Sequence, residues 1–327
     1  MKVTAFGEIM LRLSPDNHDR FMQENNFRAY FGGSEANTLI ALSSLGINTS
    51  FVTKLPENDI ADACIRELKG SGVETAFISR GGRRIGIYYC ENGTSVRCGK
   101  VIYDRQFSSI SEAGKTDFRW EEILQNTDIF HFTGITTALS DSLVEITLEA
   151  VKKAKEKGIT VSCDLNYRRT LWSEEKANGI MKKFMPYVDI LFANTGSALD
   201  VFGIGGKDDK EVMAKLSEEF GIKTIAFTTR ECRSADENTL GGILLADGKF
   251  YASKKTEVNI VDRVGGGDCF DAGILYGIIS GFSPEETVEF ANICNVYKHT
   301  VRGDFCRLNA EEIKAVCSGE SDGRIKR

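Results

Sequence analysis

The sequence of 327 residues contains a repeated pattern in which a helical stretch ends at a glycine and a short β-rich run follows. Glycine is common just after a helix because it adopts the left-handed conformation that ends the helix. Helices that alternate with apolar strands predict a mainly parallel sheet covered on both faces. The helix and strand ranges that form this pattern are 35–45 and 49–53, 59–69 and 75–78, 141–157 and 160–163, and 209–220 and 224–228.

Other extended stretches lie outside this pattern. Residues 128–132 and 188–193 read as two more buried strands, and residues 1–13 read as one amphipathic strand. Residues 84–91 and 95–103 alternate apolar and polar side chains around Asn92-Gly93, which is a strong hairpin signal. Residues 8–31 also look extended and contain no helical pattern.

We therefore expect one α/β domain over residues 1–327, with a small β-sheet contributed by about 8–31 and 84–105. Such a sheet could act as a lid that closes over a site and excludes water. The alternative is an ordinary surface hairpin, used for contact between copies of the chain. A lid hairpin often serves as such a contact, so we also expect a homo-oligomer formed through the lid.

Composition restricts the class of protein. The chain is 42% hydrophobic and 27% charged, as in folded globular proteins. A net charge of −6 argues against nucleic acid as a partner. The sequence has no run of 18 apolar residues that could span a membrane, and its start lacks the apolar core of a signal peptide. The nine cysteines are scattered without a CxxC pair, which favours reduced thiols and a cytoplasmic location.

The strongest chemical motif is the run of residues 262–268, in which three glycines lead directly into Asp268 at the expected start of a helix. Glycines 265, 266 and 267 allow backbone N–H groups to point at one anion, and the helix N-terminus adds partial positive charge. An aspartate at that place would repel an anion, so it is better interpreted as a base that deprotonates an attacking hydroxyl. The simpler alternative is an N-cap aspartate after a flexible loop.

Several other motifs are candidates for ligand contacts. Gly32-Gly33 precedes a helix start that contains Asn37, and such a turn brings backbone amides close to a ligand. Tyr103 and Arg105 end the hairpin, with Tyr89 on its other strand, and we expect residues 89 and 103 to share a face. Aromatic rings beside an arginine suit a hydroxylated acid.

Three predicted strands are followed by polar residues, and ligands of open α/β sheets bind at the carboxyl ends of the strands. Asn166 and Arg168 follow one such strand, Asn194 and Ser197 follow another, and Thr228 and Arg230 end a third. Each of these segments could also be a simple turn. Neither a GxGxxG fingerprint after the first strand nor a GxxxxGK[ST] loop occurs, which disfavours dehydrogenases and P-loop kinases.

Taken together, these motifs resemble the PfkB, or ribokinase-like, family of carbohydrate kinases. Residues 262–273, DRVGGGDCFDAG, are similar to its C-terminal signature, and Gly32-Gly33 with Asn37 is similar to its N-terminal glycine motif. GEIMLRLSP (7–15), VIYDR (101–105) and SCDLNYRRTLW (162–172) resemble the subfamily of 2-keto-3-deoxygluconate kinases. The resemblance implies a ribokinase-like fold and transfer of the ATP γ-phosphate, with Mg²⁺, to the 6-hydroxyl of 2-keto-3-deoxygluconate.

The resemblance also implies a role for each matching residue. Asp268 would be the catalytic base, and the three glycines before it the anion hole for the γ-phosphate. The sugar acid would be bound by Gly33, Asn37, Tyr89, Tyr103, Arg105 and Arg168. The nucleotide would be bound by Asn166, Thr228, Arg230, Gly265, Gly267 and Asn292, the last of these in the adenine pocket.

One departure from the family pattern leaves alternatives open. The family usually has an N-x-x-E motif that organises Mg²⁺, whereas this chain has Ser197 three residues after Asn194. A hydroxyl supplies no negative charge to a hydrated Mg²⁺ ion, so the metal ligands are not assigned. The alternatives are a kinase for another sugar, such as 2-keto-3-deoxygalactonate or fructose, and a non-catalytic sensor of sugar acids.

Overall fold

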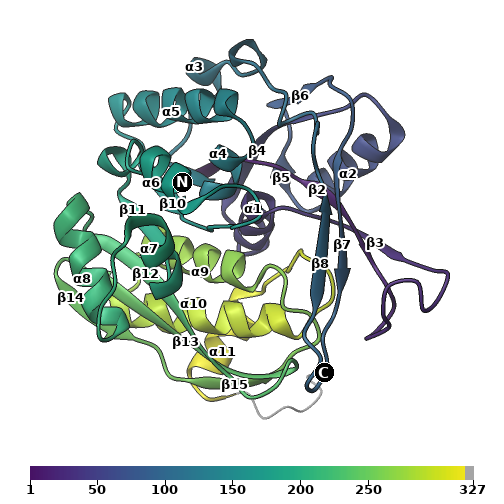
Figure 1. The fold of residues 1–327 in the computed structure, drawn as a ribbon. Helices are drawn as coiled ribbons and strands as arrows, with labels where there is room; N and C mark the ends of the chain where they lie inside the picture. Colours follow the sequence, from purple (N-terminus) through teal and green to yellow (C-terminus); the bar gives the residue numbers. More distant parts are fainter. Residues whose placement is uncertain (321–327) are drawn as a thin grey trace.

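The computed structural model describes residues 1–320, so residues 321–327 of the expected domain lie outside the described part. It shows an α/β fold with a large, mostly parallel sheet, helices on both faces and a small separate sheet (Figure 1). Fold class is therefore as the sequence predicts. Within residues 1–320, no helix is both long and apolar enough to cross a membrane.

The large sheet has the strand order β14-β13-β12-β11-β10-β9-β1-β4-β5, with β15 paired to β13 and β6 paired to β4. Strands β5, β6, β4, β1, β9, β10, β11 and β12 run parallel, and β13, β14 and β15 form an antiparallel edge. The strands are β1 (Lys2–Phe6), β4 (Asn48–Leu55), β5 (Val73–Glu74), β6 (Ile78–Arg80), β9 (Ile129–Thr133), β10 (Thr160–Asp164), β11 (Ile190–Ala193), β12 (Thr224–Cys232), β13 (Glu237–Ala246), β14 (Lys249–Ala252) and β15 (Thr256–Asn259).

Helices cover both faces of this sheet because successive strand residues point to opposite sides. On β1, Val3 and Ala5 belong to one apolar core and Phe6 belongs to the other. The first core contains α1 (Ser34–Ser44), α2 (Asp59–Gly70), α9 (Gly266–Ser280), α10 (Pro284–His299) and α11 (Ala310–Cys317). The second contains α3 (Trp120–Ile123), α4 (Gly134–Ala138), α5 (Asp141–Glu156), α6 (Glu174–Met181), α7 (Thr195–Phe202) and α8 (Asp209–Phe220), with the short 3₁₀ turns η1 (Lys115–Asp117) and η2 (Met185–Tyr187) nearby.

The small sheet has the order β3-β2-β7-β8 and stands beside the large one (Figure 1). Its strands are β2 (Met10–Ser14), β3 (Arg28–Gly32), β7 (Gly86–Glu91) and β8 (Lys100–Asp104). Three of the four lie within the two segments, about 8–31 and 84–105, that the sequence analysis expects to form a lid, and β3 extends one residue beyond the first segment, to Gly32. The prediction of a tight turn at Asn92-Gly93 is wrong, because β7 and β8 are joined by a longer loop over residues 92–99.

Two further expectations about the strands need correction. Residues 1–13 form two strands, β1 and β2, which belong to different sheets. Residues 75–78 do not form one strand, because the chain pairs with β4 twice, at β5 and again at β6. In both places a break in the strand moves the chain between sheets or registers, and a stretch of apolar residues alone does not reveal such a break.

His131 of β9 gives the fold a dependence on pH. The side chain is fully buried, and burial lowers its pKa from 6.5 to about 3. The unfolded chain takes up a proton below about pH 6.5 while the native state does not, so stability is lost as the pH falls toward 3. We expect His131→Asn to remove this pH-dependent loss of stability. The free energy of unfolding of the variant relative to the wild type should then rise by about 2 kcal/mol between pH 7 and pH 5.

Urea unfolding of both proteins at the two pH values measures this difference. Comparing the change between pH values cancels the constant effect of the substitution on packing. His18→Asn, at an exposed position, is the matched control. An equal difference at pH 7 and pH 5 would contradict the prediction.

Candidate active site

A cleft of about 710 Å³ lies where the parallel strands of the large sheet end, and the small sheet forms one of its walls. This is where ligands of open α/β sheets bind. The cleft brings together twelve of the fourteen residues to which the resemblance assigns a role. These are Gly33, Asn37, Tyr103, Arg105, Asn166, Arg168, Thr228, Arg230, Gly265, Gly266, Gly267 and Asp268.

Asp268 lies in the first turn of α9, and both of its carboxylate oxygens are hydrogen-bonded. Ser34 Oγ donates to Oδ1 at 2.5 Å, and Asn37 Nδ2 donates to Oδ2 at 2.7 Å. Asn166 Nδ2 in turn donates to Ser34 Oγ at 3.0 Å. Burial raises the pKa of Asp268, and the two hydrogen bonds oppose that shift. The carboxylate is thus held in one orientation by two side chains from α1. The sequence analysis did not predict that Ser34 would be one of them.

The glycine turn before Asp268 presents an open helix N-terminus to the cleft. Gly265 is the N-cap of α9 and has a positive φ of 87°, which glycine adopts without strain. Within residues 1–320, no side chain caps this helix end. Helix α9 has 15 residues, so its first N–H groups carry the positive end of a substantial dipole. Such an end is a site where an anion can bind.

Arg105 also lines the cleft and already has a partner. It forms a buried ion pair with Glu8, which follows β1, and Ser108 Oγ donates to the other Glu8 oxygen at 2.6 Å. The guanidinium also lies 5.3 Å from the centre of the Tyr103 ring. Glu8, which the sequence analysis did not single out as a site residue, therefore fixes the position of Arg105. Arg168, by contrast, is exposed beside the cleft.

The structure does not place Tyr89 in the cleft. In the antiparallel pair of β7 and β8, Tyr103 lies opposite Tyr88 and Tyr89 lies opposite Ile102. Tyr88 and Tyr103 therefore share a face, with their ring centres 5.9 Å apart, and both line the cleft. Tyr89 lies on the other face, where its ring packs against Phe27. The expectation that residues 89 and 103 face the same side is wrong by one residue of strand register.

A second cavity of about 540 Å³ adjoins the first on the side of β12 and β13. The two share Asn194, Gly196, Thr228 and Arg230, so they form a continuous site. Asn292 lines neither cavity. It is fully buried on α10 and donates from Nδ2 to the main-chain oxygen of Lys254 at 3.0 Å, behind the cavity wall. Its placement in the wall of a pocket is therefore not supported by the geometry.

Acidic side chains gather near Asp268. Asp164, at the end of β10, lines the cleft, and burial together with the nearby Asp268 charge raises its pKa to about 7. Asp271 lies one turn further along α9, and burial raises its pKa well above the usual range. Among the residues that the structure describes, no three His, Cys, Asp or Glu side chains are grouped as a metal site.

The structure gives Ser197 a local role. Asn194 is the N-cap of α7, and its Oδ1 accepts from the Ser197 backbone at 2.9 Å. Ser197 Oγ accepts in return from the Asn194 backbone N–H at 3.0 Å, which completes a capping box. The serine that replaces the expected glutamate thus stabilises the start of a helix beside the cleft.

Comparison with known proteins identifies the family. Residues 1–303 match the pfkB family carbohydrate kinases. The chain is 31% identical to 2-dehydro-3-deoxygalactonokinase of Haloferax volcanii, over 98% of each chain. It is 45% identical to the crystal structure of 2-dehydro-3-deoxygluconokinase from Thermotoga maritima, with a TM-score of 0.96 over 98% of this chain and 100% of the other. The chain belongs to the PfkB family and is an ATP-dependent carbohydrate kinase.

A more distant neighbour shows how widely the fold is shared. A structure from E. coli in complex with ATP and Mg²⁺, described as a candidate ribokinase II, is 20% identical. It aligns with a TM-score of 0.83 over 98% of this chain and 99% of its own. At that identity the likeness shows the ribokinase-like fold.

Proposed function

We propose that this kinase transfers the γ-phosphate of ATP to the 6-hydroxyl of 2-keto-3-deoxygluconate, giving the 6-phosphate and ADP. The observation that carries the proposal is that one cleft holds a hydrogen-bonded carboxylate, an open helix N-terminus and a buried arginine. These are a base, an anion site and a partner for a sugar-acid carboxylate. The names of the relatives from Thermotoga maritima and Haloferax volcanii support a sugar acid as substrate.

Asp268 is the proposed base. Hydrogen bonds from Ser34 and Asn37 hold both of its oxygens, so the carboxylate does not have to reorient when it accepts the proton of the sugar hydroxyl. The proton moves from the 6-hydroxyl to Asp268 as the hydroxyl oxygen attacks the γ-phosphorus. The bond between that phosphorus and the β,γ-bridging oxygen breaks, and ADP leaves.

The glycine turn is the proposed anion hole. A loose phosphoryl transition state spreads negative charge over its equatorial oxygens, so fixed N–H groups and cations stabilise it. Gly265, Gly266 and Gly267 place these N–H groups at the N-terminus of α9 beside Asp268. Arg168, which also lines the cleft, adds positive charge at the same side.

The nucleotide is proposed to lie across the two connected cavities. Thr228 and Arg230 line both cavities, so they suit the phosphate chain of ATP. The second cavity would receive the adenine ring. Mg²⁺ needs only one or two carboxylates in addition to phosphate oxygens and waters. Asp164 lines the cleft at the end of β10 and is the side chain that fits this need. Bound Mg²⁺ would neutralise part of the phosphate charge.

An assay of ADP release with a panel of sugars tests the proposed function. The panel contains 2-keto-3-deoxygluconate, 2-keto-3-deoxygalactonate and fructose, each with ATP over a range of Mg²⁺ concentrations. The galactonate is the second candidate because the relative from Haloferax volcanii carries that name. We expect the highest kcat/KM with 2-keto-3-deoxygluconate. Absence of ADP release with either sugar acid would refute the proposal.

Arg105 should determine the preference for an acid. We expect Arg105→Ala to lower kcat/KM for 2-keto-3-deoxygluconate about 10- to 100-fold more than for its neutral carboxamide, because a charge-assisted hydrogen bond to the carboxylate is lost. The substitution also leaves Glu8 buried without its ion pair, which lowers stability. The ratio of the two kcat/KM values is independent of the fraction of folded enzyme, so it isolates recognition of the carboxylate.

Arg84→Ala is the matched control for Arg105→Ala. Arg84 lies at the same edge of the small sheet, is paired with Asp104 at 2.8 Å and does not line the cleft. It should leave the ratio unchanged. Equal losses on the acid and on the amide in Arg105→Ala would argue against the carboxylate role.

The small sheet is also the proposed contact between copies of this chain, which would work as a cytoplasmic homo-oligomer. All five residues of β8 are exposed, and Val101 and Ile102 are each more than 40% exposed. An edge strand with exposed apolar side chains is a natural site of pairing with a second copy.

A further inference from the structure

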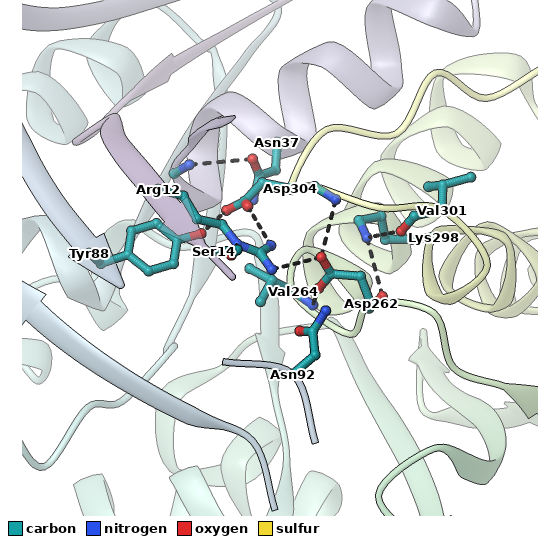
Figure 2. Close-up of polar contacts among 12 residues, drawn as sticks. Arg12, Ser14, Asn37, Tyr88, Asn92, Asp262, Val264, Lys298, Val301 and Asp304 are labelled. Atoms are coloured by element: carbon teal, nitrogen blue, oxygen red, sulfur yellow. Dashed lines mark hydrogen bonds and ion pairs between the residues drawn. The ribbon is translucent and has the colours of Figure 1, made fainter. Parts of the chain in front are cut away.

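Arg12 is a fully buried arginine on β2, in the middle of the small sheet, and every side of its guanidinium is engaged. Nη2 lies 2.7 Å from Asp262 Oδ2 and Nη1 lies 2.9 Å from Asp304 Oδ1. Nε donates to Ser14 Oγ at 2.7 Å, and the guanidinium lies 5.5 Å from the centre of the Tyr30 ring. Figure 2 shows the guanidinium between the two carboxylates. Arg12 does not line the cleft, so it has no contact with a ligand there.

Asp262, the first partner, fixes the segment that leads into the glycine turn. Its Oδ1 accepts from the Val264 backbone at 3.2 Å, directly before Gly265. Its Oδ2 accepts from the Gly303 backbone at 3.1 Å, and its main-chain oxygen accepts from the buried Lys298 Nζ at 3.3 Å (Figure 2). The Asp262 carboxylate therefore joins the entry to the glycine turn with the segment around residue 303.

Asp304, the second partner, supports the turn from the other side. A Cβ placed on Gly265 would lie 2.5 Å from the Asp304 main-chain oxygen, so the two backbones are in close contact. The Asp304 carboxylate also accepts a hydrogen bond from the hydroxyl of Tyr88, on β7 of the small sheet. Arg12 and Tyr88 thus reach from the small sheet to the two segments that border the glycine turn.

Charge makes this arrangement depend on Arg12. Asp262 and Asp304 are both buried, and burial together with the nearby Asp262 charge raises the pKa of Asp304. One guanidinium that contacts both carboxylates allows both to stay charged at a fixed separation. Without it the two carboxylates would repel each other or take up a proton, and the backbone segments they hold would shift.

We propose that Arg12 is a positioning residue that holds the glycine turn in the geometry needed for phosphoryl transfer and connects that turn to the small sheet. The inference rests on the proposed function, because it assigns the Gly265–Gly267 turn to the transferred phosphoryl group. Phosphoryl transfer depends on position and on fixed dipoles, and a misplacement of about 1 Å can cost on the order of 100-fold in rate.

The test uses Arg12→Lys, which keeps one charge but cannot span both carboxylates. We expect kcat per folded enzyme to fall about 10- to 100-fold, while the Kd values of the sugar acid alone and of ADP alone change less than twofold. Binding of ADP with aluminium fluoride and Mg²⁺ in the presence of sugar, which mimics the transition state, should weaken by the same factor as kcat. Calorimetric stoichiometry gives the folded fraction.

Arg28→Lys is the matched control, because Arg28 lies on the neighbouring strand β3 in an exposed ion pair with Asp16. It should leave kcat unchanged. If Arg12→Lys does not fold, Asp262→Asn, which keeps the shape of the side chain and does not line the cleft, decides the question with the same measurements.

Two results would overturn the inference in whichever variant folds. One is a kcat within twofold of the wild type, and the other is an equal weakening of sugar, ADP and the transition-state mimic, which indicates general loosening. Failure of the proposed function is recognised separately, because the wild-type enzyme would then release no ADP with any sugar acid.

Discussion

Asp268→Asn should lower kcat by about 10²- to 10⁴-fold, the usual contribution of a positioned base. The amide keeps the size of the carboxylate and can still accept from Ser34, but it takes up no proton from the sugar hydroxyl. One of its groups then faces Asn37 Nδ2 without forming the present hydrogen bond, so a small loss of stability accompanies the change. Steady-state kinetics with 2-keto-3-deoxygluconate, together with direct titration of the sugar, separate the two effects.

The sugar acid should bind to Asp268→Asn with a Kd within a few-fold of the wild type. Asp141→Asn is the matched control, because Asp141 is an exposed carboxylate paired with Lys176 and lies outside the cleft. Retention of more than a tenth of the wild-type kcat in Asp268→Asn would show that the carboxylate is not the base. Burial raises the pKa of Asp268, and the base must be deprotonated to act. As the pH is lowered, wild-type activity should therefore be lost at a higher pH than it would be with an ordinary aspartate.

Sequence predicted most of the large sheet because its signals are local. Helices α1, α2, α5 and α8 begin and end within one residue of the expected ranges, and α8 ends at Gly221 with a positive φ. The antiparallel edge formed by β13, β14 and β15 was not predicted. It contains no helix–glycine–strand unit, and its pairing depends on β12 continuing past residue 228.

Site residues could be predicted where the local sequence allows few backbone conformations. A run of glycines before a helix restricts the backbone strongly, so Gly265, Gly267 and Asp268 could be placed from the sequence and are found together in the cleft. Tyr89 was misplaced because side chains alternate along a strand, and the parity depends on the exact pairing of β7 with β8. The loop over residues 92–99 is five residues longer than the gap of three residues, 92–94, between the expected strands, and this odd difference reverses the parity.

Contacts between distant segments could not be read from the sequence. Arg12 and Asp304 are separated by 292 positions, and nothing near Arg12 indicates that it is buried. Glu8 and Arg105 are separated by 97 positions, and only the fold shows that the arginine has a carboxylate partner before any ligand binds. Motifs therefore locate the chemistry, whereas the side chains that orient it depend on how the two sheets pack.

Gly265→Ala should also cause a large fall in kcat. Gly265 has a φ of 87°, and an added Cβ would lie 2.5 Å from the main-chain oxygen of Asp304. A backbone atom cannot move aside as a flexible side chain can, so the turn itself must shift. We expect kcat to fall about 100-fold or more, because the N–H groups of the turn would no longer point at the transferred phosphoryl group.

Gly281→Ala separates the clash from the strain of the left-handed backbone. Gly281 ends the same helix α9 that Gly265 begins and has a φ of 71°, yet an added Cβ would meet no atom of residues 1–320 within 4 Å. Both variants bear a strain of about 1–2 kcal/mol, so both should unfold at a lower temperature. Only Gly265→Ala should lose kcat per folded enzyme. If the two variants keep the same kcat, close contact between Gly265 and Asp304 does not set the geometry of the phosphoryl site.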